Sequence, residues 1–232
     1  MYGTSSYDGF PHRHPFVTLH EVVHEQEEAR LGAGQLVTPE MLTQLMAGLG
    51  QRLPLEILPE RVLVRTTDTI VWWSPAQART MFYSDRGGDG TLKKLNGRKY
   101  PQPALLFKAS GSSLWVRALA VQERPSAISV LHTAPYWNCG DDGLVCTGTM
   151  KIPREKSVQA IESWEDSFFH SEFTHANGAR KHTTHPGGLL AMWQSLAGKD
   201  RFPFSYLVKL DETLKEFVNN HDRQRQNANP DD

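Results

Sequence analysis

The segment from Ala134 to Met150, APYWNCGDDGLVCTGTM, holds both cysteines of the chain and separates two regions of different character. Upstream of it, from residue 61, β-branched and aromatic residues recur in short runs between turn residues, which predicts strands. Downstream, from residue 153, apolar residues recur at helical spacing. Because the strands run together before these helices begin, we predict an α+β fold: an antiparallel β-meander with flanking helices.

The predicted meander begins with a hairpin. The stretch RVLVRTTDTIVWWS (61–74) places β-branched and aromatic residues on either side of a turn at Thr67–Asp68. Two more strands are expected in 103–121, joined through SGSS, and the run AISVLHTA (127–134) leads into the cysteine segment. The run QARTMFY (77–83) is too short to distinguish a strand from a helical turn. We expect about four antiparallel strands with the helices packed on one face, and the cysteine segment between meander and helices.

A strand and a helix are predicted before the meander. Phe16–His24 is rich in β-branched residues and predicts the strand. The helix follows, with Thr38 as its cap, Pro39 in its first turn and Gly50 at its end. Its expected buried stripe consists of Leu42, Leu45, Met46 and Leu49.

Three helices are predicted after the cysteine segment, and the whole chain is expected to form one domain. The helices are 157–173 with Ser157 as cap, 185–199, and 211–220 with Asp211 as cap. No repeat or Gly/Pro-rich linker divides the chain. The expected organisation of domain 1–232 is: 1–14 disordered, 16–60 strand and helix, 61–152 meander and cysteine segment, 153–220 helices, 221–232 tail.

Composition excludes several classes of function. The 232 residues are 39% hydrophobic and carry a formal net charge of −1, so a core is expected and a basic surface for nucleic acid is not. No apolar run is long enough to span a bilayer, and no export signal begins the chain. Reduced thiols and a cytoplasmic location are therefore expected. Without a Gly-rich phosphate loop or dinucleotide fingerprint, no cofactor is expected.

The two cysteines allow three interpretations. Composition alone favours simple packing, because free cysteine is commonly buried. A metal site is disfavoured, because Cys139, Cys146 and the nearby His132 leave a four-ligand set incomplete. A nucleophile fits a Gly- and Asp-rich surface loop that a macromolecule can reach. Since Asp141 and Asp142 would raise the pKa of a neighbouring thiol, the loop suits thioester exchange better than a preformed Cys/His ion pair.

The same segment resembles the active-site segment of ubiquitin-conjugating enzymes. In that family a His-Pro-Asn tripeptide is followed, eight residues after the asparagine, by the catalytic cysteine in a Gly-x-Val-Cys run. Here Tyr136-Trp137-Asn138 is followed eight residues later by Cys146, within the run Gly143 to Cys146. From about Ile70 onward the chain resembles a bacterial branch, the PRTRC system protein B group, through WWSPAQARTMFY, YPQPALLF, APYWN…GLVCTG and WEDSFFHSEFTH.

The resemblance implies roles for these residues. Cys146 would accept a ubiquitin-like protein as a thioester, and Asn138 would donate a hydrogen bond to the oxyanion formed when that thioester is attacked. Tyr136 and Trp137 replace the histidine and proline of the tripeptide. The loop is completed by Gly143 and Val145, and Cys139 is expected to be a bystander. For Asn138 the alternative role is a turn cap, and one asparagine can serve both.

Four histidines, His170, His175, His182 and His185, lie close together in the sequence. A zinc site is disfavoured, because His170 and His175 are not on one helical face, so no metal is predicted. His175 is a candidate local acid or base near the cysteine. The favoured alternative is that the segment is a capped helix end at Asn177–Gly178.

The resemblance also implies partners. They are a ubiquitin-like protein, a ThiF-like activating enzyme that uses ATP, an acceptor that the sequence does not identify, and a JAB-type peptidase of the same system; neither nucleic acid nor a membrane is expected. The predicted activity is that of a thioester-forming ubiquitin-like-protein transferase. The alternative is a non-catalytic module of the same fold that binds the ubiquitin-like protein or scaffolds a complex.

Overall fold

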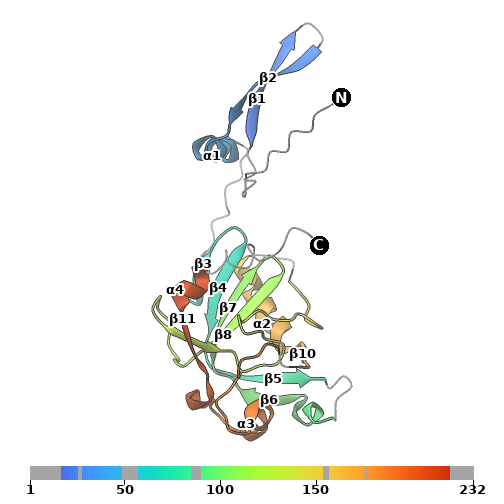
Figure 1. Cartoon of the computed structure of the whole chain (residues 1–232), viewed down its shortest axis with the longest axis vertical. Coiled ribbons are helices and arrows are strands. Elements are labelled where there is room, and N and C mark those ends of the chain that lie inside the picture. Colours follow the sequence, from blue (N-terminus) through green and yellow to red (C-terminus); the bar gives the residue numbers. More distant parts are fainter. Residues whose placement is uncertain are drawn as a thin grey trace, which may run out of the picture. The chain divides into compact units, whose positions relative to one another are not determined.

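The computed structural model describes residues 17–25, 28–48, 57–84, 90–153, 157–175 and 177–219. They belong to two compact units, 1–56 and 57–232, and each is described by itself (Figure 1). The predicted disordered start and C-terminal tail lie outside the described residues. The single-domain organisation stays a prediction.

The first unit consists of a hairpin and one helix. Strands β1 (Thr18–Glu25) and β2 (Glu28–Leu36) pair antiparallel, and α1 spans Pro39–Gly48. The sequence indicated β1 but not β2, whose glycines and alanines are poor strand formers. The Thr38 cap is confirmed, because its hydroxyl accepts a hydrogen bond from an amide in the first turn of α1.

The predicted buried stripe of α1 is wrong for the residues that the structure describes. Leu42, Leu45 and Met46 are 45%, 51% and 44% exposed. Leu49, the fourth predicted member, lies outside the described residues. A two-stranded hairpin with one short helix encloses too little volume to bury a full apolar face.

The second unit is built on a six-stranded antiparallel sheet with strand order β11-β9-β8-β7-β4-β3. Its strands are β3 (Val62–Arg65), β4 (Thr69–Ser74), β7 (Ala104–Ser110), β8 (Ser113–Leu119), β9 (Val130–Thr133) and β11 (Lys209–Thr213). The predicted α+β class and the antiparallel meander are confirmed. The sheet has six strands rather than about four, because β9 pairs with β8 and β11 returns from the C-terminal region to pair with β9.

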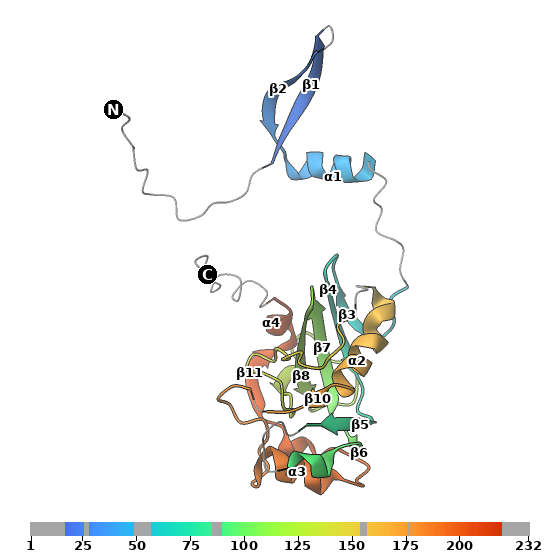
Figure 2. The same cartoon turned by 90° about the vertical axis from the view of Figure 1, so that its right-hand side faces the viewer.

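A three-stranded sheet of order β10-β5-β6 supplements the meander. It contains β5 (Ala78–Tyr83), β6 (Arg98–Pro101) and β10 (Glu172–Phe173), with the short 3-10 helix η1 (Leu92–Leu95) before β6. The run that the sequence left undecided is thus strand β5. Figure 1 and Figure 2 both show β5 and β6 beside α3, across one end of the main sheet. The pairing of β10 with β5 fixes the segment that follows α2.

The helices of the second unit are α2 (Ile161–Phe169), α3 (Gly188–Leu196) and α4 (Leu214–Asn219), with 3-10 turns η2 (Val158–Ala160) and η3 (Phe204–Tyr206). The predicted helix 157–173 was too long, since its last residues form β10. Within the described ranges, no helix has the length and apolar character needed to cross a bilayer.

The cap predicted at Asp211 for the last helix is wrong. Asp211 lies within β11, and α4 begins only after Thr213. The hydroxyl of Thr213 accepts a hydrogen bond from the amide of Glu216 at 3.4 Å, and the Glu216 carboxylate accepts one from the amide of Thr213 at 2.7 Å. This reciprocal pair is a capping box at Thr213 and Glu216.

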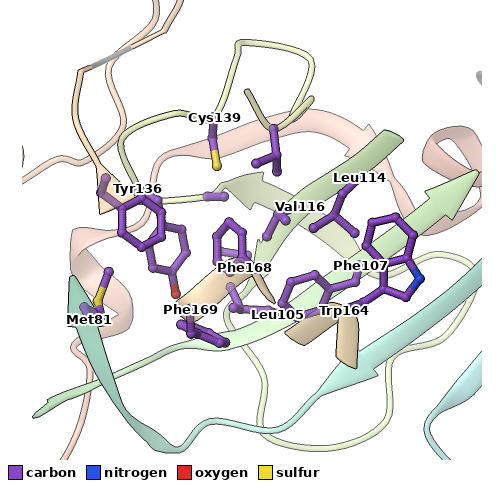
Figure 3. Close-up of a cluster of buried hydrophobic side chains, with 14 of the residues drawn as sticks. Met81, Leu105, Phe107, Leu114, Val116, Tyr136, Cys139, Trp164, Phe168 and Phe169 are labelled. Carbon is purple, nitrogen blue, oxygen red and sulfur yellow. The ribbon is translucent and has the colours of Figure 1, made fainter. Parts of the chain in front are cut away.

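Two cores lie on opposite faces of the main sheet, because alternate residues of each strand point to opposite sides. The inner core includes the buried aromatic residues Phe107, Tyr136, Trp164 and Phe168 (Figure 3). Phe173 and, from α3, Trp193 belong to the same core. The outer core joins Val71, Trp73, Leu106, Leu119 and Leu131 to Leu214 and Phe217 of α4. The expectation that the helices pack on one face is therefore wrong, because α4 covers the other.

Candidate active site

Residues 138–146 form a short antiparallel hairpin, hereafter the cysteine hairpin. The amide of Cys146 donates to the carbonyl of Asn138 at 2.7 Å, and Cys139 pairs with Val145 in a β-bridge. The turn is closed over 140–143 by a backbone hydrogen bond of 2.9 Å. This pairing places the asparagine and the second cysteine of the predicted motif opposite each other.

The second arm of the cysteine hairpin is held on the edge of β8. Leu144 forms a bridge with Trp115, and the amide of Val116 donates to the carbonyl of Gly143 at 2.9 Å. Gly143 has φ of +87°, and a Cβ atom there would lie 2.8 Å from the Val116 carbonyl oxygen. A glycine is therefore required at this close approach of two backbones, and Val145 beyond it is buried.

The two thiols lie in different environments. Cys139 is 1% exposed, and Figure 3 shows its sulfur directed into the inner core, near Val116 and Phe168. Burial raises the pKa of Cys139 to about 12, which suppresses its thiolate form near neutral pH. Cys146 is exposed. The packing interpretation therefore describes Cys139, whereas Cys146 is accessible to a macromolecular partner.

The aromatic pair before Asn138 anchors the hairpin in the core. The hydroxyl of Tyr136 donates to Oε1 of Gln102 at 2.7 Å, and its ring packs against Phe168 with centroids 5.2 Å apart. Complete burial raises the pKa of Tyr136, which keeps this donor neutral. The ring of Trp137 meets Tyr83 edge-on at 5.5 Å. These two residues thus connect the hairpin to the inner core and to β5.

Asn138 links the cysteine hairpin to the segment that contains β10. Its φ is +62°, a left-handed conformation that asparagine tolerates better than most residues. The side-chain Nδ2 donates to the carbonyl of Glu172 at 2.8 Å, and Oδ1 accepts from the amide and hydroxyl of Thr174 at 3.1 and 3.0 Å. The amide of His175 donates to the same oxygen at 3.4 Å. These contacts are those of a buried turn residue.

His175 lies beside Asn138 in the backbone pattern. Its carbonyl accepts from the Asn138 amide at 2.8 Å, and the Asn138 carbonyl in turn accepts from Cys146. The His175 side chain is exposed, and its Nδ1 lies 2.8 Å from the Thr174 hydroxyl. The helix end favoured at Asn177–Gly178 is wrong, because α2 ends at Phe169 and β10 intervenes. The structure thus places His175, Asn138 and Cys146 on adjacent stretches of backbone.

The remaining histidines of the four each contact a different part of the protein. Nδ1 of His170 lies 2.8 Å from the carbonyl of Asp166, Nε2 of buried His182 lies 2.9 Å from the carbonyl of Cys139, and His185 packs on Tyr206. Among the described residues, no three His, Cys, Asp or Glu side chains are arranged to hold a metal ion. His182 instead braces the first arm of the cysteine hairpin.

Asp141 has a role that sequence reasoning missed. Its carboxylate accepts hydrogen bonds from the amides of Ala179 and Arg180, each at 3.0 Å, and these bonds lower the pKa of Asp141. It thereby ties the turn of the hairpin to the loop after β10. No local pattern signals this contact or those of Thr174 and His182, because each spans 36 or more residues of sequence.

Comparison with known proteins identifies the family of the chain. The family model described as prokaryotic E2 family D matches residues 38–210, from α1 to β11. No curated protein and no solved structure shows significant similarity to the chain. The match covers well over half of the sequence and includes the whole cysteine hairpin, which confirms the resemblance to a bacterial ubiquitin-conjugating-like family. The chain belongs to prokaryotic E2 family D.

Proposed function

We propose that this protein is a carrier that accepts a ubiquitin-like protein as a thioester on Cys146 and transfers it to an acceptor. The observation that carries the proposal is the pairing of Asn138 with Cys146, which lies at the end of the second arm away from the turn. The thiol is exposed there, whereas the thiol of Cys139 is buried with its pKa raised to about 12. Family membership favours a ubiquitin-like protein as the transferred group.

The transfer involves two displacements at one carbonyl carbon. In loading, the Cys146 thiolate attacks the thioester on the activating enzyme; the new sulfur–carbon bond forms, and the activating enzyme's thiolate leaves. In discharge, an acceptor amine attacks, the carbon–nitrogen bond forms, and Cys146 leaves as thiolate. The amine proton must pass to a base, and His175 is the candidate because its backbone adjoins Asn138. An acceptor thiol would react in the same way, with a new sulfur–carbon bond formed as Cys146 leaves.

In this proposal Asn138 serves both as a turn residue and as the oxyanion donor. Its amide group has two N–H bonds, and the structure assigns one of them to the carbonyl of Glu172. The three donors on Oδ1, from Thr174 and His175, fix the plane of the amide. A donor held in this way needs little reorganisation when charge develops on the oxygen. The second N–H is the one proposed to stabilise the oxyanion.

The proposed partners follow from this scheme. A ThiF-like enzyme would adenylate the ubiquitin-like protein with ATP and present it as a thioester, and a JAB-type peptidase of the same system would process it. The acceptor is an amine or a thiol. Because the reaction needs a reduced cysteine and ATP, we place it in the cytoplasm.

The test is reconstitution with purified partners. The chain is incubated with ATP, a ThiF-like enzyme and a ubiquitin-like protein of the same system, and the products are separated on non-reducing gels. We expect a band shifted by the mass of the ubiquitin-like protein that requires ATP and collapses on addition of reductant. If the activating enzyme becomes charged but the chain does not, the non-catalytic binding module is the correct reading.

A further inference from the structure

Arg117 is buried where β8 changes partners. At Arg117 the strand pairs with Thr133 of β9, and two residues earlier Trp115 pairs with Leu144 of the cysteine hairpin. Only 5% of the Arg117 side chain is exposed. Burying a guanidinium is costly unless its donors find acceptors, so its partners define what it does.

The guanidinium of Arg117 joins three elements. Its Nε donates to the carboxylate of Glu212 in β11 at 2.9 Å, and Nη1 donates to the backbone carbonyl of Asp141, in the turn of the hairpin, at 3.2 Å. Its Cζ atom lies 5.8 Å from the centre of the Phe217 ring in α4. Lys108 anchors the same helix end, because its Nζ donates to the Phe217 carbonyl at 3.0 Å.

The hairpin turn is shaped to receive this side chain. A Cβ atom at Gly143 would lie 2.9 Å from Nη1 of Arg117, so the guanidinium packs directly on the hairpin backbone. Asp141 is held on both of its polar groups: its carbonyl by Arg117, and its carboxylate by the amides of Ala179 and Arg180. The turn is therefore clamped between the sheet and the loop after β10.

We propose that Arg117 is a positioning residue for Cys146, and that through it the β11–α4 segment sets the position of the cysteine hairpin. This inference rests on the proposed function of Cys146. The planar guanidinium reaches Glu212 and Asp141 with donors of fixed mutual geometry, which the single ammonium of lysine cannot reproduce. A partner that displaces β11 or α4 would thereby change transfer at Cys146.

The test compares Arg117→Lys and Glu212→Gln with a matched control, Arg61→Lys. Arg61 also pairs with a buried carboxylate, that of Glu165, at 2.7 Å, but this pair joins α2 to the segment before β3. Amide hydrogen exchange is measured first. We expect the Val145 and Gly143 amides to exchange at least about threefold faster in both test variants, with β4 and β7 unchanged. A residue that only stabilised the fold would accelerate exchange throughout the sheet.

Single-turnover loading is measured next. We expect Arg117→Lys to slow loading on the order of 10- to 100-fold, as misplacement of a reacting group does. The double variant Arg117→Lys/Glu212→Gln should load no more slowly than Arg117→Lys alone. Wild-type loading in Arg117→Lys, or hairpin exchange equal to that of Arg61→Lys, overturns the inference. If Arg117→Lys does not fold, Glu212→Gln decides. If the wild-type chain never loads, the proposed function fails, while the exchange data still report whether Arg117 holds the hairpin.

Discussion

The two arms of the cysteine hairpin each carry one thiol, yet the arms end in opposite environments. The first arm leads from Asn138 into the inner core, where Cys139 is 1% exposed. The second arm follows the edge of β8 and ends at Cys146, which is exposed. Within the first arm, the Asn138 side chain donates a hydrogen bond to the β10 segment, whereas the Cys139 side chain packs in the inner core.

This difference shows that burial, rather than the neighbouring residues in the sequence, distinguishes the accessible thiol of Cys146 from the enclosed thiol of Cys139. The sequence suggests that Asp141 acts as a charge that raises the pKa of a neighbouring thiol. In the structure its carboxylate instead accepts hydrogen bonds from amides of the loop after β10. For Cys139, desolvation is the main cause of the raised pKa, and the Asp142 charge adds less. Substitutions in each arm test this comparison.

The largest expected effect is on loading. Cys146→Ser should abolish the thioester and leave at most an oxyester that survives reductant but is cleaved by base or hydroxylamine. Cys139→Ser should load at the wild-type rate, because its side chain is buried in the inner core. Loading is followed on non-reducing gels with and without these reagents. The opposite pattern, loss with Cys139→Ser alone, would show that the arms have been assigned the wrong roles.

The next effect is on discharge and separates the two roles of Asn138. Asn138→Gly keeps the left-handed backbone and removes the amide, whereas Asn138→Ala also adds strain at φ +62°. We expect both variants to slow discharge to an amine on the order of 100- to 1,000-fold, the usual loss for one oxyanion donor. Loading should change little, because it exchanges one thioester for another of similar energy and needs little help from an oxyanion donor.

Melting temperature provides the control for Asn138. Asn138→Ala should melt below Asn138→Gly because of the backbone strain, although both lack the same side chain. If discharge is normal in both variants and only the melting temperature falls, Asn138 is a turn residue and nothing more. Rates that follow the melting temperatures would lead to the same conclusion.

Much of the meander was predictable from local pattern. The hairpin β3–β4 and the pair β7–β8 consist of β-branched and aromatic runs joined by turn residues, and each was found close to its predicted bounds. The errors occur where a distant segment decides the conformation. Residues 172–173 and 211–213, predicted to be helical, belong to strands that pair with β5 and β9, and this pairing overrides the helical spacing of the sequence.

The residues of the proposed site can be named from the sequence, but their environment cannot be predicted from it. The spacing of Asn138 and Cys146 and the glycine at 143 are visible in the sequence, and resemblance to a family supplied their expected roles. The sequence does not show that Cys139 enters the core, because the residues that cover it come from β8 and α2. The side chain of Asn138 forms hydrogen bonds with Glu172 and Thr174, and no sequence pattern near the hairpin predicts these contacts.

A smaller effect compares one glycine in each arm. Gly143→Ala should destabilise the fold by about 1–3 kcal/mol, because φ is +87° and the new Cβ would contact the Val116 carbonyl. In Gly140→Ala the new Cβ would meet the flexible Asp142 side chain at 3.0 Å and the Leu144 carbonyl oxygen at an ordinary 3.5 Å, so the change should cost less than about 1 kcal/mol. Urea unfolding followed by tryptophan fluorescence measures both. Equal costs would mean that the β8 edge does not constrain the second arm.

The smallest expected effect is a pH dependence of stability that arises from the first arm. Burial raises the pKa of Cys139 from its usual value of 9.0 to about 12. Between these pH values the unfolded chain loses the thiol proton while the folded chain keeps it, so the unfolded state is favoured as pH rises. The stabilisation is complete below pH 9 and disappears progressively up to pH 12. Between pH 8 and 10 the loss should be on the order of 1 kcal/mol.

Cys139→Ala isolates this contribution. Both proteins carry Cys146→Ala, so that no disulfide forms at high pH, and urea unfolding is measured at pH 8, 9 and 10. Removal of the buried sulfur shifts the stability at every pH by a constant, whereas the slope above pH 9 depends on the thiol. We expect the protein that retains Cys139 to lose more stability with rising pH than Cys139→Ala does. Parallel curves would show that the thiol of the first arm titrates as freely as in the unfolded chain, which contradicts its burial in the inner core.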